Sequence, residues 1–262
     1  MITVIEKYFL WIMIYSIIGW IYESILCSVE QKKFINRGFL NGPYCPVYGF
    51  GAIVDIIVMG RIDNPFLLFF FGALLTCILE YLTSFTMEAI FHARWWDYSD
   101  RKFNIKGRVC LLGAVVFGLF SMVLIKFIHP LVSELTGRIP ALAMHISVSV
   151  LAAAFISDII VTVTGFTGFN EKLREIALMF EQKKTEVIKN ADSYKSTAAE
   201  KLHEIASKRP HPFNEIFTGK LNAQQRRMIK SFPKLKSVKY NNILTEIRNA
   251  VQNAKKNIKK TH

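Results

Sequence analysis

The chain has 262 residues, of which 52% are hydrophobic and 20% are Lys, Arg, Asp or Glu. A soluble chain of this size carries about 25% charged residues and lacks long apolar runs, so this composition excludes an ordinary soluble domain. The charge is also uneven, with a net charge of +1 over residues 1–164 and +12 over residues 165–262. We therefore predict two parts, a transmembrane helix bundle over 1–164 and a basic cytoplasmic helical tail over 165–262.

Four apolar runs are long enough to cross a bilayer, whose hydrocarbon core of about 30 Å needs about 20 helical residues. They cover residues 8–27, 65–91, 109–128 and 140–164. The first run lacks a small-residue cleavage site, so we interpret it as a retained helix and not as a signal peptide. The expected fold class is an all-α, polytopic membrane helix bundle.

A fifth run, 46–62, is short, rich in glycine and interrupted by Asp55. It either spans the membrane or enters it as a re-entrant segment. With five spans, the Lys- and Arg-bearing loops 28–45 and 92–108 lie on the same side as the tail, as the positive-inside rule requires. We therefore favour about five spans, with the N-terminus outside and the C-terminus inside.

Five carboxylates fall within the apolar runs, where each costs about 2.5–3.5 kcal/mol at a helix centre. They are Glu23, Asp55, Glu80, Glu88 and Asp158. The deep part of the bundle has no matching Lys or Arg, so these acids either hold a proton or neutralise a cation on a substrate or ion path. Asp55 and Glu80 lie nearest to mid-depth and are the strongest candidates. The alternative is a structural role, with hydrogen bonds to Tyr, Ser, Thr or backbone groups.

The segment 36–51, NRGFLNGPYCPVYGFG, is rich in glycine and proline. Glycine permits close backbone approach and proline interrupts helical hydrogen bonding, so the segment suits a broken helix that lines a polar cavity. The alternative is an ordinary tight loop. The expected cavity-lining residues are Asn41, Gly42, Pro43, Tyr44, Pro46 and Tyr48.

The tail predicts one long helix over 170–208 with a heptad-like apolar stripe, followed by shorter helices over 222–232 and 238–257. The stripe is compatible with packing on another helix, with pairing in a homo-oligomer, or with a solvated helix. A basic cluster comprises Arg226, Arg227, Lys230, Lys234, Lys236 and Lys239. It is either a solubilising surface, a site for anionic inner-leaflet lipid, or a site for an acidic partner. No nucleic-acid-binding motif is present.

The sequence offers no arrangement for catalysis, for a metal or for a cofactor. Its four cysteines lack metal-site spacing, and no Ser/His or Cys/His arrangement indicates an enzyme. Trp95, Trp96 and Tyr98 follow the run 65–91 and are typical of an interfacial aromatic anchor.

Two segments, GFLNGPYCPVYGFGA (38–52) and WWDYSDRKFNIKGRVCLLGAVVFG (95–118), resemble signature blocks of a bacterial family labelled type IV ABC-transporter, or CmpB-like, permeases. The segment 221–240 is similar to the ends of some members. The resemblance implies a multi-pass protein of the cell membrane. If the chain is a permease subunit, as the family label says, a separate ATPase subunit is its expected partner. The sequence contains no GxxxxGK[ST] phosphate loop and no Glu-Ala-Ala loop. A short helix in loop 92–108 or in the tail would then contact the ATPase.

These observations favour a permease-like protein for a small solute or ion, with Asp55 and Glu80 in its polar path. The alternative is a membrane scaffold or regulator without transport, whose basic tail binds lipid or a partner protein.

Overall fold

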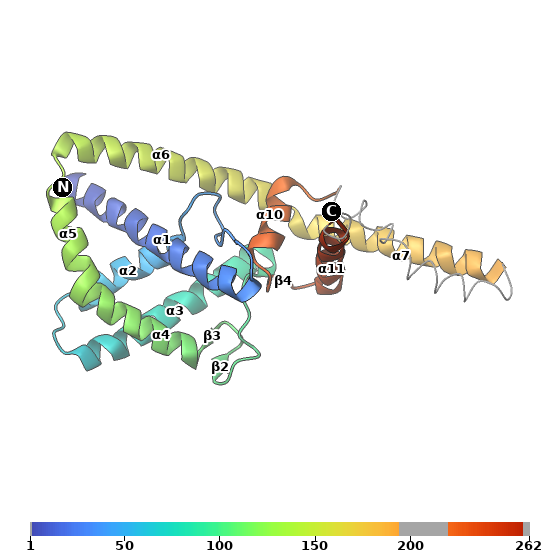
Figure 1. The fold of residues 1–262 in the computed structure, drawn as a ribbon, viewed down its shortest axis with the longest axis horizontal. Helices are drawn as coiled ribbons and strands as arrows, with labels where there is room; N and C mark the ends of the chain where they lie inside the picture. Colours follow the sequence, from blue (N-terminus) through green and yellow to red (C-terminus); the bar gives the residue numbers. More distant parts are fainter. Residues whose placement is uncertain (1, 194–219, 259–262) are drawn as a thin grey trace.

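The computed structural model describes residues 2–193 and 220–258, and most of them lie in helices (Figure 1). In chain order the helices are α1 (Ile2–Gln31), α2 (Pro46–Met59), α3 (Pro65–Phe91), α4 (Leu111–Val123), the π-helical turn η1 (Leu124–Ile128), α5 (His129–Gly137), α6 (Ala141–Phe166), α7 (Phe169–Ser193), α10 (Ala223–Ser231) and α11 (Asn241–Ile258). The strands are β1 (Ala93–Arg94), β2 (Asn104–Ile105), β3 (Val109–Cys110) and β4 (Lys236–Ser237).

Four helical segments are long and apolar enough to cross a membrane. They are Val4–Gln31, Pro65–Phe91, Leu111–Gly137 and Ala141–Gln182. Their outward faces carry many exposed Leu, Ile, Val and Phe side chains, which suits contact with lipid. The all-α polytopic bundle expected from the sequence is confirmed.

Local sequence explains where these helices begin and bend. The Asn64 side chain accepts hydrogen bonds from the first backbone N–H groups of α3, and Pro65 occupies the position where no N–H is needed. The π-helical turn η1 ends two residues before Pro130, whose missing N–H disturbs the regular ladder. Gly168 has a φ of +75° and separates α6 from α7.

The weak run contains a half-length helix. At 14 residues, α2 is about 21 Å long, which is shorter than the hydrocarbon core. The Cys45 N–H at its start donates to the Ser16 carbonyl at 2.8 Å, and Ser16 lies in the middle of α1. The loop before α2 therefore folds back along α1 as far as the middle of that helix.

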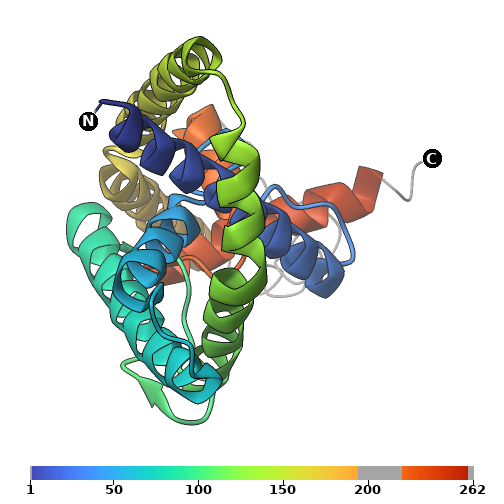
Figure 2. The ribbon, with the colours of Figure 1, turned by 90° about the vertical axis from the view of Figure 1, so that its left-hand side faces the viewer.

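The chain enters the bundle at one end and the tail helices lie at the opposite end, which we call the tail side (Figure 1). This arrangement is compatible with a fifth crossing made by the loop and α2, but 46–62 as a spanning or a re-entrant segment stays a prediction. Figure 2 shows α2 among α1, α3 and α4. It packs directly on α1, on α3 and on η1, which continues α4. The absolute orientation, with the N-terminus outside, stays a prediction.

The close approach of α1 and α2 depends on glycine. A Cβ at Gly49 would overlap the Ile12 carbonyl oxygen and the Ser16 hydroxyl, and a Cβ at Gly19 would overlap the Tyr48 ring. Because neither residue has a side chain, the two backbones come close enough to seat the loop.

On the tail side, α10, α11 and the start of α7 form one apolar cluster with the end of α6 and with Trp95. β4 pairs antiparallel with β1, so the tail is joined to the loop after α3. α10 and α11 occur where the sequence predicts helices. The predicted helix over 170–208 is α7 as far as Ser193, and the rest of that prediction lies outside the described residues.

Candidate functional site

Three of the five intramembrane acids are engaged by partners on both oxygens or by cations. Glu88 at the end of α3 lies 2.9 Å from Arg94 Nε and 3.0 Å from Arg108 Nη1. The Arg108 guanidinium also lies over the rings of Tyr81 and Phe85. This pair of arginines neutralises Glu88 and fixes the loop after α3 to the helix.

Glu23 of α1 is paired at the level of the α2 start. Its Oε1 accepts from the Tyr48 hydroxyl at 2.7 Å, and its Oε2 lies 3.5 Å from Arg37 Nε. Both partners come from segment 36–51. Glu23 therefore joins the folded-back loop to α1.

Asp158 of α6 holds the tip of the same loop. Its Oδ1 accepts from the Asn41 backbone N–H at 3.0 Å, the Asn41 amide at 2.8 Å and the Thr162 hydroxyl at 3.0 Å. Its Oδ2 accepts from the Gly42 N–H and the Tyr44 hydroxyl, both at 2.7 Å. Five donors stabilise one carboxylate, so Asp158 needs no further cation.

The segment 36–51 thus contacts two acids at once. Asn41, Gly42 and Tyr44 bond to Asp158, and Tyr48 bonds to Glu23. Of the remaining two residues of the predicted set, Pro43 is exposed at the loop tip and Pro46 starts α2.

Asp55 and Glu80 are different, because neither pairs with a cation in the described ranges and each accepts a hydrogen bond from a single hydroxyl group. Asp55 of α2 is 2% exposed, and its Oδ2 accepts from the Ser121 hydroxyl of α4 at 2.6 Å. Glu80 of α3 accepts from the Tyr98 hydroxyl at 3.1 Å through Oε1. The buried Oδ1 of Asp55 and Oε2 of Glu80 have no hydrogen-bond partner within 2–193 and 220–258.

These two carboxyl groups lie at different depths of one interior. Ser121 packs against Gly72 of α3, where a Cβ would overlap the serine side chain. Glu80 is eight residues further along α3, which corresponds to about 12 Å towards the tail side. Asp55 and Glu80 therefore lie at different levels along α3.

Sequence reasoning missed Ser121 and Tyr98. Ser121 is a single hydroxyl within an apolar run, and nothing in its neighbourhood in the sequence marks it. Tyr98 was expected to anchor the interface, but its hydroxyl reaches into the bundle to Glu80. The spacing of Tyr98 from the end of α3 carries no signal, because the connecting loop turns back.

Segment 36–51 is also held from the tail. The Arg227 guanidinium of α10 donates to the carbonyl oxygens of Gly38 at 3.2 Å, Phe39 at 2.5 Å and Leu40 at 3.0 Å. In return Arg37 donates to the Ser231 carbonyl at 3.1 Å. We call these contacts the tail clamp.

Two further tail cations pair with acids of the bundle. Lys236 lies 2.6 Å from Asp97, and Lys234 lies 3.5 Å from Glu30. Burial raises the pKa of Asp97, but the hydrogen bonds from Lys236 and Ser99 outweigh it and lower that pKa to about 2. Of the predicted basic cluster, the exposed cations without an ion pair in the described ranges are Arg226, Lys230 and Lys239.

One expectation about the loop after α3 is wrong. Residues 92–108 are all described and contain no helix, but contain β1 and part of the β2–β3 hairpin. The short chain between Tyr98 and Cys110 favours a hairpin because Phe103, Lys106 and Gly107 all take positive φ. Of the two places where the sequence predicts a short helix, only the tail contains helices in its described residues, among them α10.

Metal and thiol chemistry find no support in the described ranges. No group of three or more His, Cys, Asp or Glu residues is placed to hold a metal ion there. The four cysteines are free thiols, and three of them are buried.

The bundle, its lipid-facing helices and its buried carboxylates define an integral, multi-pass membrane protein. Residues 10–163 match the sequence model of the family described as "Putative ABC-transporter type IV", which is more than half of the chain. The chain belongs to that family. The match ends before α7, so the tail helices lie outside it. No curated protein and no solved structure matches the chain.

Proposed function

We propose that the protein is a transporter or permease subunit of the cell membrane that moves a small cation, or a solute together with protons, between α2, α3 and α4. Asp55 and Glu80 bind the cation or proton. The observation that carries the proposal is their half-bonded state, with one buried oxygen of each lacking a partner in the described part of the chain.

The physical argument is one of charge. An anionic carboxylate in an apolar interior is costly unless a cation or several donors compensate it. Glu23, Glu88 and Asp158 have such compensation, whereas Asp55 and Glu80 each have a single hydroxyl donor. Each of the two therefore holds a proton or neutralises a cation, and exchange of one for the other is the step that a carrier needs.

The half-helix α2 supports a moving path. In many transporters a broken helix places its end at mid-depth, beside the substrate or ion site. Here the loop that is held by Asp158 and by the tail clamp reaches the middle of the bundle. Release of the Arg227 contacts frees the carbonyls of residues 38–40 and opens the tail side of the path.

A separate ATP-binding subunit fits the family membership, because the sequence has no phosphate loop of its own. We propose that it contacts the tail side near α10. That helix touches the loop at 38–40 through Arg227, so a push on α10 reaches the path directly.

The test is flux into proteoliposomes that contain the full chain and an internal pH-sensitive dye, with imposed potential and cation gradients. We expect the native protein to move protons or the cation, and Asp55→Asn and Glu80→Gln to abolish the flux at equal protein levels. Glu134→Gln, an exposed acid on the opposite end, is the matched control. Flux that is unchanged in both interior variants contradicts the proposal.

The second candidate is a membrane scaffold without transport. Two observations favour it. The negative charge of three of the five acids is compensated by cations or by several donors, and Arg226, Lys230 and Lys239 of the tail are exposed. Unchanged flux together with loss of a co-purifying protein in a variant of these three cations would support it.

A further inference from the structure

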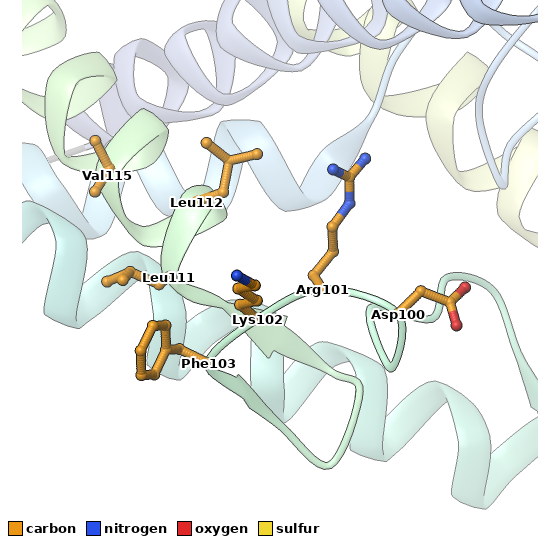
Figure 3. Close-up of a pocket in the computed structure, with 7 residues that line it drawn as sticks. All are labelled: Asp100, Arg101, Lys102, Phe103, Leu111, Leu112 and Val115. Atoms are coloured by element: carbon orange, nitrogen blue, oxygen red, sulfur yellow. The ribbon is translucent and has the colours of Figure 1, made fainter.

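A hollow lies on the tail side where the loop after α3 meets the start of α4 (Figure 3). Its volume is about 490 Å³ and it is open on one side. The lining residues are Asp100, Arg101, Lys102, Phe103, Leu111, Leu112 and Val115.

The hollow has uncompensated positive charge. Three other charged groups of this loop are paired, Arg94 and Arg108 with Glu88, and Asp97 with Lys236, whereas Lys106, which does not line the hollow, has no ion pair in the described ranges. Arg101 and Lys102 have no ion-pair partner among residues 2–193 and 220–258.

Asp100 also lines the hollow and offsets one of these two cations, so the lining keeps a net charge of +1. An anion is therefore the favoured occupant by charge.

The rest of the lining is apolar and faces outward. Phe103 is 78% exposed and Leu112 is 58% exposed. Figure 3 shows Phe103 beside Leu111, with Leu112 and Val115 on the adjoining turns of α4. This surface continues directly into the lipid-facing side of the α4 span, so it lies at the boundary between headgroups and acyl chains.

The backbone holds Phe103 in this position at a cost. Its φ is +52°, a left-handed conformation that is unfavourable for an aromatic residue. The Leu111 N–H donates to the Phe103 carbonyl at 3.1 Å, which ties the loop to the first turn of α4. The result is an aromatic ring presented to the membrane next to two cations.

We propose that this hollow binds one anionic phospholipid of the tail-side leaflet. Its phosphate lies between Arg101 and Lys102, and an acyl chain follows Leu112 and Val115 with Phe103 at its upper end. The volume falls within the range of sites for small ligands. The apolar lining favours a lipid over free phosphate, which would leave Leu112 and Phe103 without a partner. This site is separate from the basic cluster of the tail.

The test is native mass spectrometry of the detergent-purified full chain, titrated with phosphatidylglycerol or phosphatidylcholine. We expect one phosphatidylglycerol to bind, and the double variant R101Q/K102Q to weaken it about thirtyfold, since each cation near the headgroup contributes about fivefold. The matched control R61Q/R138Q removes two cations at the opposite end and should leave binding unchanged. The tail cations are intact in both variants, so they cannot account for a difference.

Three results would overturn the proposal. They are equal weakening in the two double variants, binding of phosphatidylcholine as tight as that of phosphatidylglycerol, and displacement of the lipid by millimolar glycerol phosphate, which would indicate a simple anion site. Phe103→Gly, which accepts the left-handed backbone, should weaken binding without changing the preference for the anionic lipid. Loss of that preference in Phe103→Gly would also count against it.

Discussion

Asp158→Asn tests the hold of α6 on the folded-back loop. The amide oxygen of asparagine can keep the donors from Asn41 and Thr162. Its NH2 group then replaces Oδ2, where it faces the Gly42 N–H and the Tyr44 hydroxyl, both at 2.7 Å. Two charge-assisted hydrogen bonds are lost, and the part-buried NH2 group faces the Gly42 N–H, which is another donor.

Each lost bond to a charged group is worth about 1.5–3 kcal/mol, so the free energy of unfolding should fall by about 3 kcal/mol or more. For a chain of this length that corresponds to a Tm lower by about 6–12 °C. Thermal unfolding of the detergent-purified protein measures it. The loop should also loosen, so Cys45, which is buried at the start of α2, should become reactive to a thiol reagent, as read by peptide mass spectrometry.

Asp63→Asn is the matched control. Asp63 is fully exposed and pairs with Lys126 at 3.1 Å, so solvent screens the pair and its loss should leave the Tm nearly unchanged. Equal Tm shifts in the two variants, or an unreactive Cys45 in Asp158→Asn, would refute the reasoning.

Three further predictions follow from single contacts. Gly49→Ala should lower the Tm because the new Cβ overlaps the α1 backbone. Gly51→Ala, whose Cβ meets only a leucine methyl at 4.0 Å, should leave the Tm unchanged. Equal Tm shifts in the two variants contradict the close packing of α1 on α2. Arg227→Ala removes three donors to the loop carbonyls and should speed proteolysis of the tail several-fold, while Arg226→Ala, whose side chain bonds only within α10, should leave the rate unchanged. The pKa of Asp97 is lowered from 3.8 to about 2, so the stability that its ionised carboxylate gives the fold is complete above about pH 4 and is lost as the pH falls towards 2. The Tm difference between Asp97→Asn and the native protein should therefore shrink at low pH. A Tm difference that is equal at all pH values contradicts this.

The long spans and the tail helices could be predicted from the sequence because their patterns are local. An apolar run such as 65–91 is sufficient for a membrane helix whatever it packs against. The interruption at Pro233 likewise separates α10 from α11 without any tertiary information.

The partners of the acids could not be predicted, because they come from distant segments. Asp158 bonds to residues more than a hundred positions earlier, and Asp55 bonds to Ser121 of another helix. The positive-inside rule assigns Arg37 to a membrane side but does not show that it turns back towards Glu23. The hairpin after α3 was missed because the positive φ at Phe103 and Lys106 is set by its contacts and not by glycine.

The central claim is that the interior at Asp55 belongs to a path and not to a sealed core. Its most direct test is the reaction of Ser121→Cys with a small cationic thiol reagent in native membranes, after the native cysteines are replaced by alanine. Glu134→Cys, at an exposed position, reports that the reagent is active. We predict that Ser121→Cys reacts, more slowly than Glu134→Cys, and that Asp55→Asn abolishes its preference for the cationic reagent over a neutral one. A Ser121→Cys variant that stays unreactive while Glu134→Cys is labelled would contradict the account.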